Sequence, residues 1–334
     1  MSAAASPSSP SKLPLGAELS RFAKWCRVNP LSLVLLVGCL ATLFYFFYAL
    51  PAFYKGERSA FVWAMSAWNS ENNQEHSFLV LPIAAFLVWY HRREIETAPK
   101  APSNAGLAFA LAGVALYVLS VRSLQPRIAL VALPLLIYGG VRFVWGREPA
   151  RILIFPCLFL LFTIPIGGIV QGTVSLQLFV SSSVKLLASL VGVKVQMDGT
   201  TLRALDGTFN FEIAEGCSGI RSLMAMTMLA ALYVHFTQRE VWKQIVIFCG
   251  SVVFALIGNI GRVFTVILFA RFISPEIASG IYHDYSGFIF FPFAVAAMVS
   301  FSRLLNSDWQ AFAARQQNPG AAGKKDPSPI SYDY

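Results

Sequence analysis

Residues 212–223 read Glu-Ile-Ala-Glu-Gly-Cys-Ser-Gly-Ile-Arg-Ser-Leu, and here a polar, strand-like segment runs straight into an apolar block. Cys217 stands at the junction, next to Ser218 and Gly219. The block that follows, to about residue 236, is long enough to cross a membrane as a helix. Two later segments place Arg262 and His283 at similar junctions. The stretch therefore predicts a boundary between bilayer and water that carries reactive side chains.

Composition is typical of a polytopic α-helical membrane protein. Of the 334 residues, 56% are hydrophobic and 13% are charged, and the mean hydropathy is +0.60. Soluble globular domains have about 25% charged residues, and a transmembrane helix needs ~20 mostly apolar residues. We therefore expect an all-α polytopic fold with about eight transmembrane helices, at residues 31–50, 77–90, 104–121, 128–145, 152–170, 218–236, 244–269 and 285–303.

The transmembrane catalytic domain is expected to span residues 30–304, between disordered tails at 1–29 and 305–334 that are rich in small and polar residues. The first apolar block is long and no clear cleavage site follows it, which favours an uncleaved anchor over a signal peptide. We expect the seventh helix to be interrupted at Gly258-Asn259-Ile260-Gly261-Arg262, and residues 271–284 to form a loop.

The region before Cys217 differs from the apolar blocks. In residues 171–192, polar residues recur every three to four positions among Leu and Val, which predicts an amphipathic helix on the bilayer surface. A ninth crossing is the alternative. Next, Asp198-Gly199 and Asp206-Gly207 separate short alternating runs and predict a β-hairpin or three-stranded flap. Because open sheet edges are not tolerated in lipid, we expect this flap on the extracytoplasmic side, outside the hydrocarbon.

The basic residues indicate topology and not a nucleic-acid partner. The net charge is +9, but the 26 Lys and Arg are dispersed between apolar blocks. With eight crossings, 16 of them lie on the side of the termini and eight on the other side. The positive-inside rule then predicts a multi-pass protein of the cell (inner or plasma) membrane with both termini cytoplasmic. Under that topology Cys217, Arg262 and His283 share one depth near the extracytoplasmic face.

Cys217 is the expected nucleophile. A thiol with a pKa of ~8.5 needs a helix N-terminus or a cationic neighbour to form the reactive thiolate. The predicted helix start supplies the first, and Arg262 or His283 could supply the second. A buried structural cysteine is the alternative. The other four cysteines (26, 39, 157 and 249) form no CxxC or metal spacing, and no cofactor motif occurs, so we expect neither a metal nor a cofactor.

Arg262 is expected to bind a substrate carboxylate or to stabilise a tetrahedral oxyanion. A charge within a transmembrane helix costs at least ~2.5–3.5 kcal/mol, and such residues usually face a polar site. Gly258 and Gly261 would let another helix approach closely, and Asn259, one turn earlier, would orient the guanidinium. Snorkelling to the outer interface is the alternative.

His283 is the expected general acid and base for acyl transfer, with Asp284 or a tyrosine to orient it. An interfacial histidine without function is the alternative. His76, also on the predicted outer side, is a second candidate. Glu215 could bond the site or a substrate amine, or only keep the flap solvated. Arg221 is either a second anion-binding group or an interfacial anchor, and Ser218 adjoins the nucleophile.

Four motifs resemble the exosortase/archaeosortase family of membrane cysteine transpeptidases, over roughly residues 30–303. They are Glu215-Gly-Cys-Ser-Gly-Ile-Arg-Ser222, Asn259-Ile-Gly-Arg262, His283-Asp-Tyr-Ser-Gly287 and His76-Ser-Phe-Leu-Val-Leu-Pro82. The resemblance implies that Cys217, Arg262 and His283 are the catalytic set. It also implies a substrate: an exported protein whose C-terminal signal, of PEP-CTERM type in bacteria, has a short motif, a transmembrane helix and a basic cytoplasmic tail. The implied reaction removes that helix and transfers the protein to an acceptor, which stays open.

Two other functions stay open from the residues. One is a membrane transporter or flippase in which Arg262 contacts an anionic substrate, for which Cys217 would be dispensable. The other is an assembly factor for exopolysaccharide export, in which the three junction residues only pack. The expected partners are protein substrates and membrane lipid, with no nucleic acid.

Overall fold

The computed structural model describes residues 30–53, 58–69, 72, 74–165, 170–212 and 219–307, together with Gly16 and Ser20. The chain divides into two compact units. The first unit consists of Met1–Ser66 and His91–Cys157, and the second of Ala67–Tyr90 and Leu158–Tyr334. The predicted tails at 1–29 and 305–334 lie almost wholly outside the described residues, so their disorder stays a prediction.

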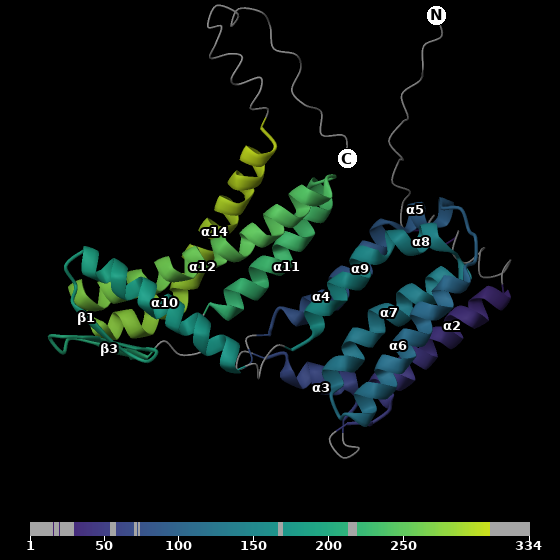
Figure 1. Cartoon of the computed structure of the whole chain (residues 1–334), viewed down its shortest axis with the longest axis horizontal. Helices are drawn as coiled ribbons and strands as arrows, with labels where there is room; N and C mark the ends of the chain where they lie inside the picture. Colours follow the sequence, from purple (N-terminus) through teal and green to yellow (C-terminus); the bar gives the residue numbers. More distant parts are fainter. Residues whose placement is uncertain are drawn as a thin grey trace, which may run out of the picture. The chain divides into compact units, whose positions relative to one another are not determined.

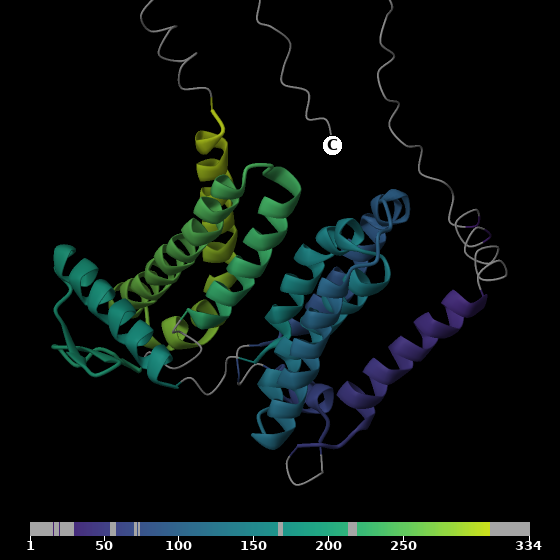
Figure 2. The ribbon, with the colours of Figure 1, turned by 45° about the vertical axis from the view of Figure 1, so that its right-hand side comes forward.

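The first unit is built on a helical hairpin. Helices α6 (Asn104–Arg122) and α7 (Pro126–Val144) lie side by side in Figure 1 and Figure 2. Gly139 makes this approach possible, because a Cβ there would lie 2.4 Å from the backbone nitrogen of Ala110. The other elements of this unit are α2 (Pro30–Phe44), the π-helical turn η1 (Tyr45–Ala49), most of α3 (Ala60–Ala67), α5 (Arg92–Thr97) and α8 (Arg147–Ile152).

The second unit is built around α12 (Val241–Phe272), which packs against α11 (Ile220–Thr237) on one side and α14 (His283–Leu305) on the other (Figure 2). Two short elements, α13 (Pro275–Ile277) and the π-helical turn η5 (Ala278–Tyr282), connect α12 to α14. The predicted loop at 271–284 is therefore largely helical. Helix α4 (Ser77–Tyr90) packs against the 3-10 turn η3 (Leu160–Thr163).

A small sheet and α10 (Val170–Leu190) complete the second unit. Strands β1 (Val195–Asp198), β2 (Thr201–Ala204) and β3 (Asn210–Glu212) pair antiparallel in that order, with Asp198 opposite Thr201 and Leu202 opposite Phe211. The strands follow the runs that the two Asp-Gly turns separate. Buried residues of α10, the sheet and α12 share one apolar cluster, which includes Val184, Leu202 and Ile267. The placement of α10 and the sheet outside the hydrocarbon stays a prediction.

Five described helices are long and apolar enough to cross a membrane: α6, α7, α11, α12 and residues 285–305 of α14. They coincide, within a few residues, with five of the predicted crossings, which confirms a mostly helical, polytopic membrane protein. Apolar helices at Val37–Ala49, Ser77–Tyr90, Ile154–Thr163 and Val174–Leu190 are shorter, so the number of eight crossings stays a prediction.

Two helix predictions are wrong. The helix expected at 152–170 is shorter: α9 (Ile154–Phe159) continues directly into η3, and the helical run ends at Thr163, before Pro165. A proline removes a backbone donor, so the apolar run does not continue as one helix. Conversely, α12 runs through Gly258 and Gly261 without interruption. Both glycines pack against α14, since a Cβ on Gly258 would lie 3.2 Å from Ala294 Cβ.

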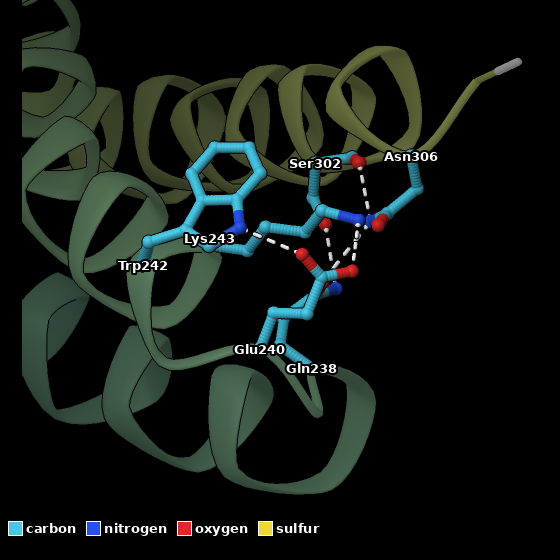
Figure 3. A network of polar contacts seen from close by, with 6 residues as sticks. All are labelled: Gln238, Glu240, Trp242, Lys243, Ser302 and Asn306. Carbon is cyan, nitrogen blue, oxygen red and sulfur yellow. Dashed lines mark hydrogen bonds and ion pairs between the residues drawn. The ribbon is translucent and has the colours of Figure 1, made fainter.

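A polar cluster ties the turn after α11 to the end of α14 (Figure 3). The buried Gln238 donates from Nε2 to Ser302 Oγ at 3.2 Å and accepts from Asn306 Nδ2 at 3.1 Å. Tyr233 also donates to Ser302 Oγ, at 3.1 Å. In the same turn a carboxylate accepts from two neighbours, in the contacts Lys243 Nζ to Glu240 Oε1 and Trp242 Nε1 to Glu240 Oε2. This cluster holds three helices at one end of the second unit.

Candidate active site

Asn259 and Arg262 lie one turn apart on α12, between its two helical neighbours. Asn259 is 4% exposed, and Arg262 is partly buried. Helix α12 contacts both α11 and α14, so this short segment can meet the beginnings of both helices. Asn259 makes the contact with the start of α11, and Arg262 makes the contact with the start of α14.

The contact with α11 is made at Gly219, the residue before the helix. Its φ of +82° is one that residues with side chains rarely adopt, and a Cβ there would lie 2.7 Å from Asn259 Nδ2. The chain reverses at residues 238–240, and Gly219 and Asn259 each lie about 20 residues, or ~30 Å, from that turn. They therefore meet as equidistant positions of an antiparallel pair. The backbone two residues after Cys217 is thus held against α12.

The contact with α14 is made by Arg262 itself. Its Nε donates to Ser286 Oγ at 2.9 Å, and Ser286 is fully buried. A hydrogen bond to a charged group is worth about 1.5–3 kcal/mol, so this bond restrains the guanidinium. Ser286 lies one turn after position 283, where α14 begins. The segment that carries His283 is therefore held beside Arg262.

Tyr282 fixes the start of α14 a second time. Its hydroxyl donates to Thr265 Oγ1 at 2.8 Å, and its ring stacks on Phe269 with centroids 3.9 Å apart. Both partners belong to α12, one and two turns after Arg262. The residue before His283 thus packs along the same helix that carries Arg262.

Arg221, in the first turn of α11, pairs with Glu75, just before α4. The Nε to Oε2 distance is 3.5 Å, and the two side chains are 51% and 43% exposed. An ion pair this exposed contributes at most about 1 kcal/mol. It does show that the start of α4 lies beside the start of α11. Neither role predicted for Arg221, anion binding or interfacial anchoring, included this carboxylate partner.

His76 follows Glu75 and is partly buried. Burial lowers the pKa of the His76 imidazole below its ordinary value, and the nearby Glu75 carboxylate opposes this shift. Its Nε2 is buried and has no hydrogen-bond partner among the described residues. Burial thus favours the neutral form of His76, which lies near the start of α11, at the same end of the unit as Gly219.

Several predicted site residues cannot be placed. Cys217, Glu215 and Ser218 lie outside the described residues, and for His283 and Asp284 the structure describes the backbone alone. Their convergence with Arg262 stays a prediction. Sequence reasoning missed Ser286 as a partner of Arg262, although its i+3 spacing from His283 on one helix was a usable signal.

Comparison with known proteins supplies the family. Residues 68–300 match the family model described as transmembrane exosortase, which covers more than half of the chain. No curated protein and no solved structure matches the chain. The matched range contains all the candidate residues, from His76 to Asp284, and the helices α11, α12 and almost all of α14. The family supports a membrane transpeptidase-type role in general, with protein substrates that carry sorting signals. The chain belongs to the transmembrane exosortase family.

Proposed function

We propose that the protein is an integral-membrane cysteine transpeptidase that cleaves a C-terminal sorting signal, of PEP-CTERM type, from exported proteins. One observation carries the proposal: the Asn259–Arg262 segment contacts Gly219, two residues after Cys217, and Ser286, three residues after His283. These contacts support a shared site for the thiol, the guanidinium and the imidazole.

In the proposed reaction, the Cys217 thiolate attacks the carbonyl carbon of the scissile peptide bond. The guanidinium of Arg262 stabilises the oxyanion that forms. His283 donates a proton to the leaving amine as the carbon–nitrogen bond breaks, and a thioester remains. An acceptor amine or water, deprotonated by His283, then attacks the thioester and releases Cys217.

The supporting side chains have positioning roles in this scheme. The Arg262 bond to Ser286 uses one of the five guanidinium donors and restrains the whole group. Asn259 holds the start of α11 through its contact with Gly219. We assign Asp284 the orientation of His283, and Glu215 and Ser218 contacts beside the nucleophile. Arg221 then acts through its pair with Glu75 and not as a catalytic group.

We propose that the site faces the extracytoplasmic side of the inner membrane and that both termini are cytoplasmic. Gly219 lies about 20 residues, or ~30 Å, from the α11–α12 turn, which equals the thickness of the hydrocarbon core. The site and the polar cluster at that turn would then lie on opposite faces. The distribution of Lys and Arg favours the turn as the cytoplasmic face.

The test is co-expression of the full chain with a tagged exported protein that ends in a motif, a transmembrane helix and a basic tail. Wild type should release the tagged protein with a new C-terminus, identified by mass spectrometry. Cys217→Ala should leave the substrate intact in the membrane. The matched control is Cys249→Ala, since Cys249 is an exposed cysteine of α12. Normal processing by a folded Cys217→Ala variant would end the proposal.

A second measurement tests the side of the membrane. In a variant whose single cysteine is Cys217, a membrane-impermeant thiol reagent should label intact cells from outside. Labelling only after the cytoplasmic face is exposed excludes the proposed orientation. Loss of function in Arg262→Ala with full function in Cys217→Ala would indicate a transporter instead.

A further inference from the structure

Two buried side-chain nitrogens at the start of α4 have no hydrogen-bond partner among the described residues. We call Gln74, His76 and Ser77 the α4 corner. Gln74 is 1% exposed, yet its Nε2 has no hydrogen-bond partner among the described residues, and the same holds for the buried Nε2 of His76. Buried polar side chains are hydrogen-bonded in the large majority of cases. Two exceptions within three residues therefore require an explanation.

The Ser77 hydroxyl does not satisfy all the hydrogen-bonding groups of Gln74. Its hydroxyl lies 3.1 Å from Gln74 Oε1 and 3.0 Å from the Phe162 carbonyl oxygen of η3. A hydroxyl has one proton and can fully donate to only one of them. The Gln74 amide thus makes at most one side-chain hydrogen bond among the described residues, against the four that an amide can make. Most of the hydrogen-bonding capacity of the buried Gln74 amide is therefore unused.

The position of the α4 corner indicates which kind of ligand could bind there. Glu75, between the two side chains, pairs with Arg221 in the first turn of α11, four residues after Cys217. The α4 corner therefore lies beside the beginning of α11, at the end of the second unit that carries the proposed active site. A peptide bound at the start of α11 would therefore lie close to the α4 corner.

The charges favour a neutral ligand. An amide and a neutral imidazole together offer hydrogen-bond donors and acceptors but no cation. Arg221, the cation that the described contacts place beside the corner, pairs with Glu75, whose carboxylate disfavours an anion such as a phosphate. A main-chain peptide group offers one C=O acceptor and one N–H donor, which complements this pair.

We propose that the α4 corner is a substrate subsite in which Gln74 and His76 bind one main-chain peptide group of the sorting signal, next to the scissile bond. The inference rests on the proposed function and adds the residues that hold the peptide. Ser77, which bonds both Gln74 and η3, is the positioning residue of this subsite.

The test is Gln74→Met in the full chain, with the tagged substrate described above. Methionine has a similar length, fills the same volume and leaves Ser77 its bond to Phe162. Because the lost group has no intramolecular partner on Nε2, thermal stability should stay unchanged or rise. KM should increase about 2- to 10-fold, the change expected when one hydrogen bond between neutral groups is lost, while kcat changes less.

The matched control is Gln238→Met, at the opposite end of α11. Gln238 is also buried, but its amide bonds both Ser302 and Asn306. This variant should lose thermal stability and keep the wild-type KM. An unchanged KM in a folded Gln74→Met variant, with substrate still cleaved, overturns the subsite and leaves the proposed function intact.

A binding measurement separates the two proposals further. In the inactive Cys217→Ala background, tagged substrate should co-purify with the membrane protein, and adding Gln74→Met or His76→Phe should reduce its recovery by the same factor as the KM increase. Equal recovery in all three proteins contradicts the subsite. Failure of wild type to cleave any candidate signal contradicts the proposed function instead.

Discussion

Gly219→Ala should destabilise the second unit by about 2–5 kcal/mol and impair the site. Two costs add. A residue with a Cβ in the left-handed region costs roughly 1–2 kcal/mol, and φ of Gly219 is +82°. The added methyl group would also lie 2.7 Å from Asn259 Nδ2 and 2.8 Å from its Cγ, and overpacking of this kind costs roughly 1–3 kcal/mol.

A matched variant separates the two costs. Gly192 has a φ of +80°, but a Cβ there meets nothing within 4 Å. Gly192→Ala should therefore carry the backbone cost alone, about 1–2 kcal/mol. Removing the amide of Asn259 should relieve part of the clash, so Gly219→Ala/Asn259→Ala should be more stable than the two separate losses predict.

The assay is thermal unfolding of the purified variants in one detergent at one scan rate, because unfolding of such proteins is often irreversible. Substrate cleavage is measured in parallel. Equal losses of unfolding temperature in Gly219→Ala and Gly192→Ala, with no coupling to Asn259→Ala, would refute the contact between α11 and α12 at this point. Cleavage at the wild-type rate in Gly219→Ala would refute its link to the site.

Three further changes test other parts of the second unit. Ser286→Ala should lower cleavage by roughly 10-fold or more, because Arg262 loses a bond worth about 1.5–3 kcal/mol, and Ser286→Thr should restore part of it; equal rates in all three would contradict a positioning role. Ser302→Ala should lower the unfolding temperature, by about 1–3 kcal/mol in stability, while the KM of the folded protein stays at the wild-type value, and an unchanged unfolding temperature would show that the polar cluster adds no stability. For His76, whose pKa burial lowers, stability should be full above about pH 6.5 and decline as pH falls from there toward the folded pKa, because the unfolded chain takes up the proton first. His76→Phe should flatten this decline in the unfolding temperature, and an identical slope in both proteins would assign the acid sensitivity to other groups.

The long helices could be predicted because their signal is local. An apolar run such as 104–121 or 128–145 must satisfy its backbone hydrogen bonds internally in lipid, so length and composition suffice to predict a helix. The prediction at 152–170 was too long for a reason that is also local, since Pro165 follows the end of the helical run at Thr163. The predicted break at Gly258 and Gly261 was wrong for a reason that is not local. Helix α14 packs closely against both glycines and supports a continuous helix there.

A polar partner for Arg262 could also be predicted. An arginine within an apolar helix is costly enough to imply a polar partner, and Arg262 has one in Ser286. The identity of that partner could not be predicted, because any polar residue on a neighbouring helix would serve. The same holds for Gln74, whose unpartnered Nε2 becomes visible only when its surroundings are known.

Composition, apolar run lengths and motifs were enough to predict a mostly helical membrane protein of the transmembrane exosortase family. The contact of Asn259 with Gly219 and the hydrogen bond from Arg262 to Ser286 became known only from the packing of the helices. Both contacts depend on the register of neighbouring helices. Which residues of two helices meet depends on where the intervening turn ends and on how the helices pack. The hydropathy of the segments predicts neither.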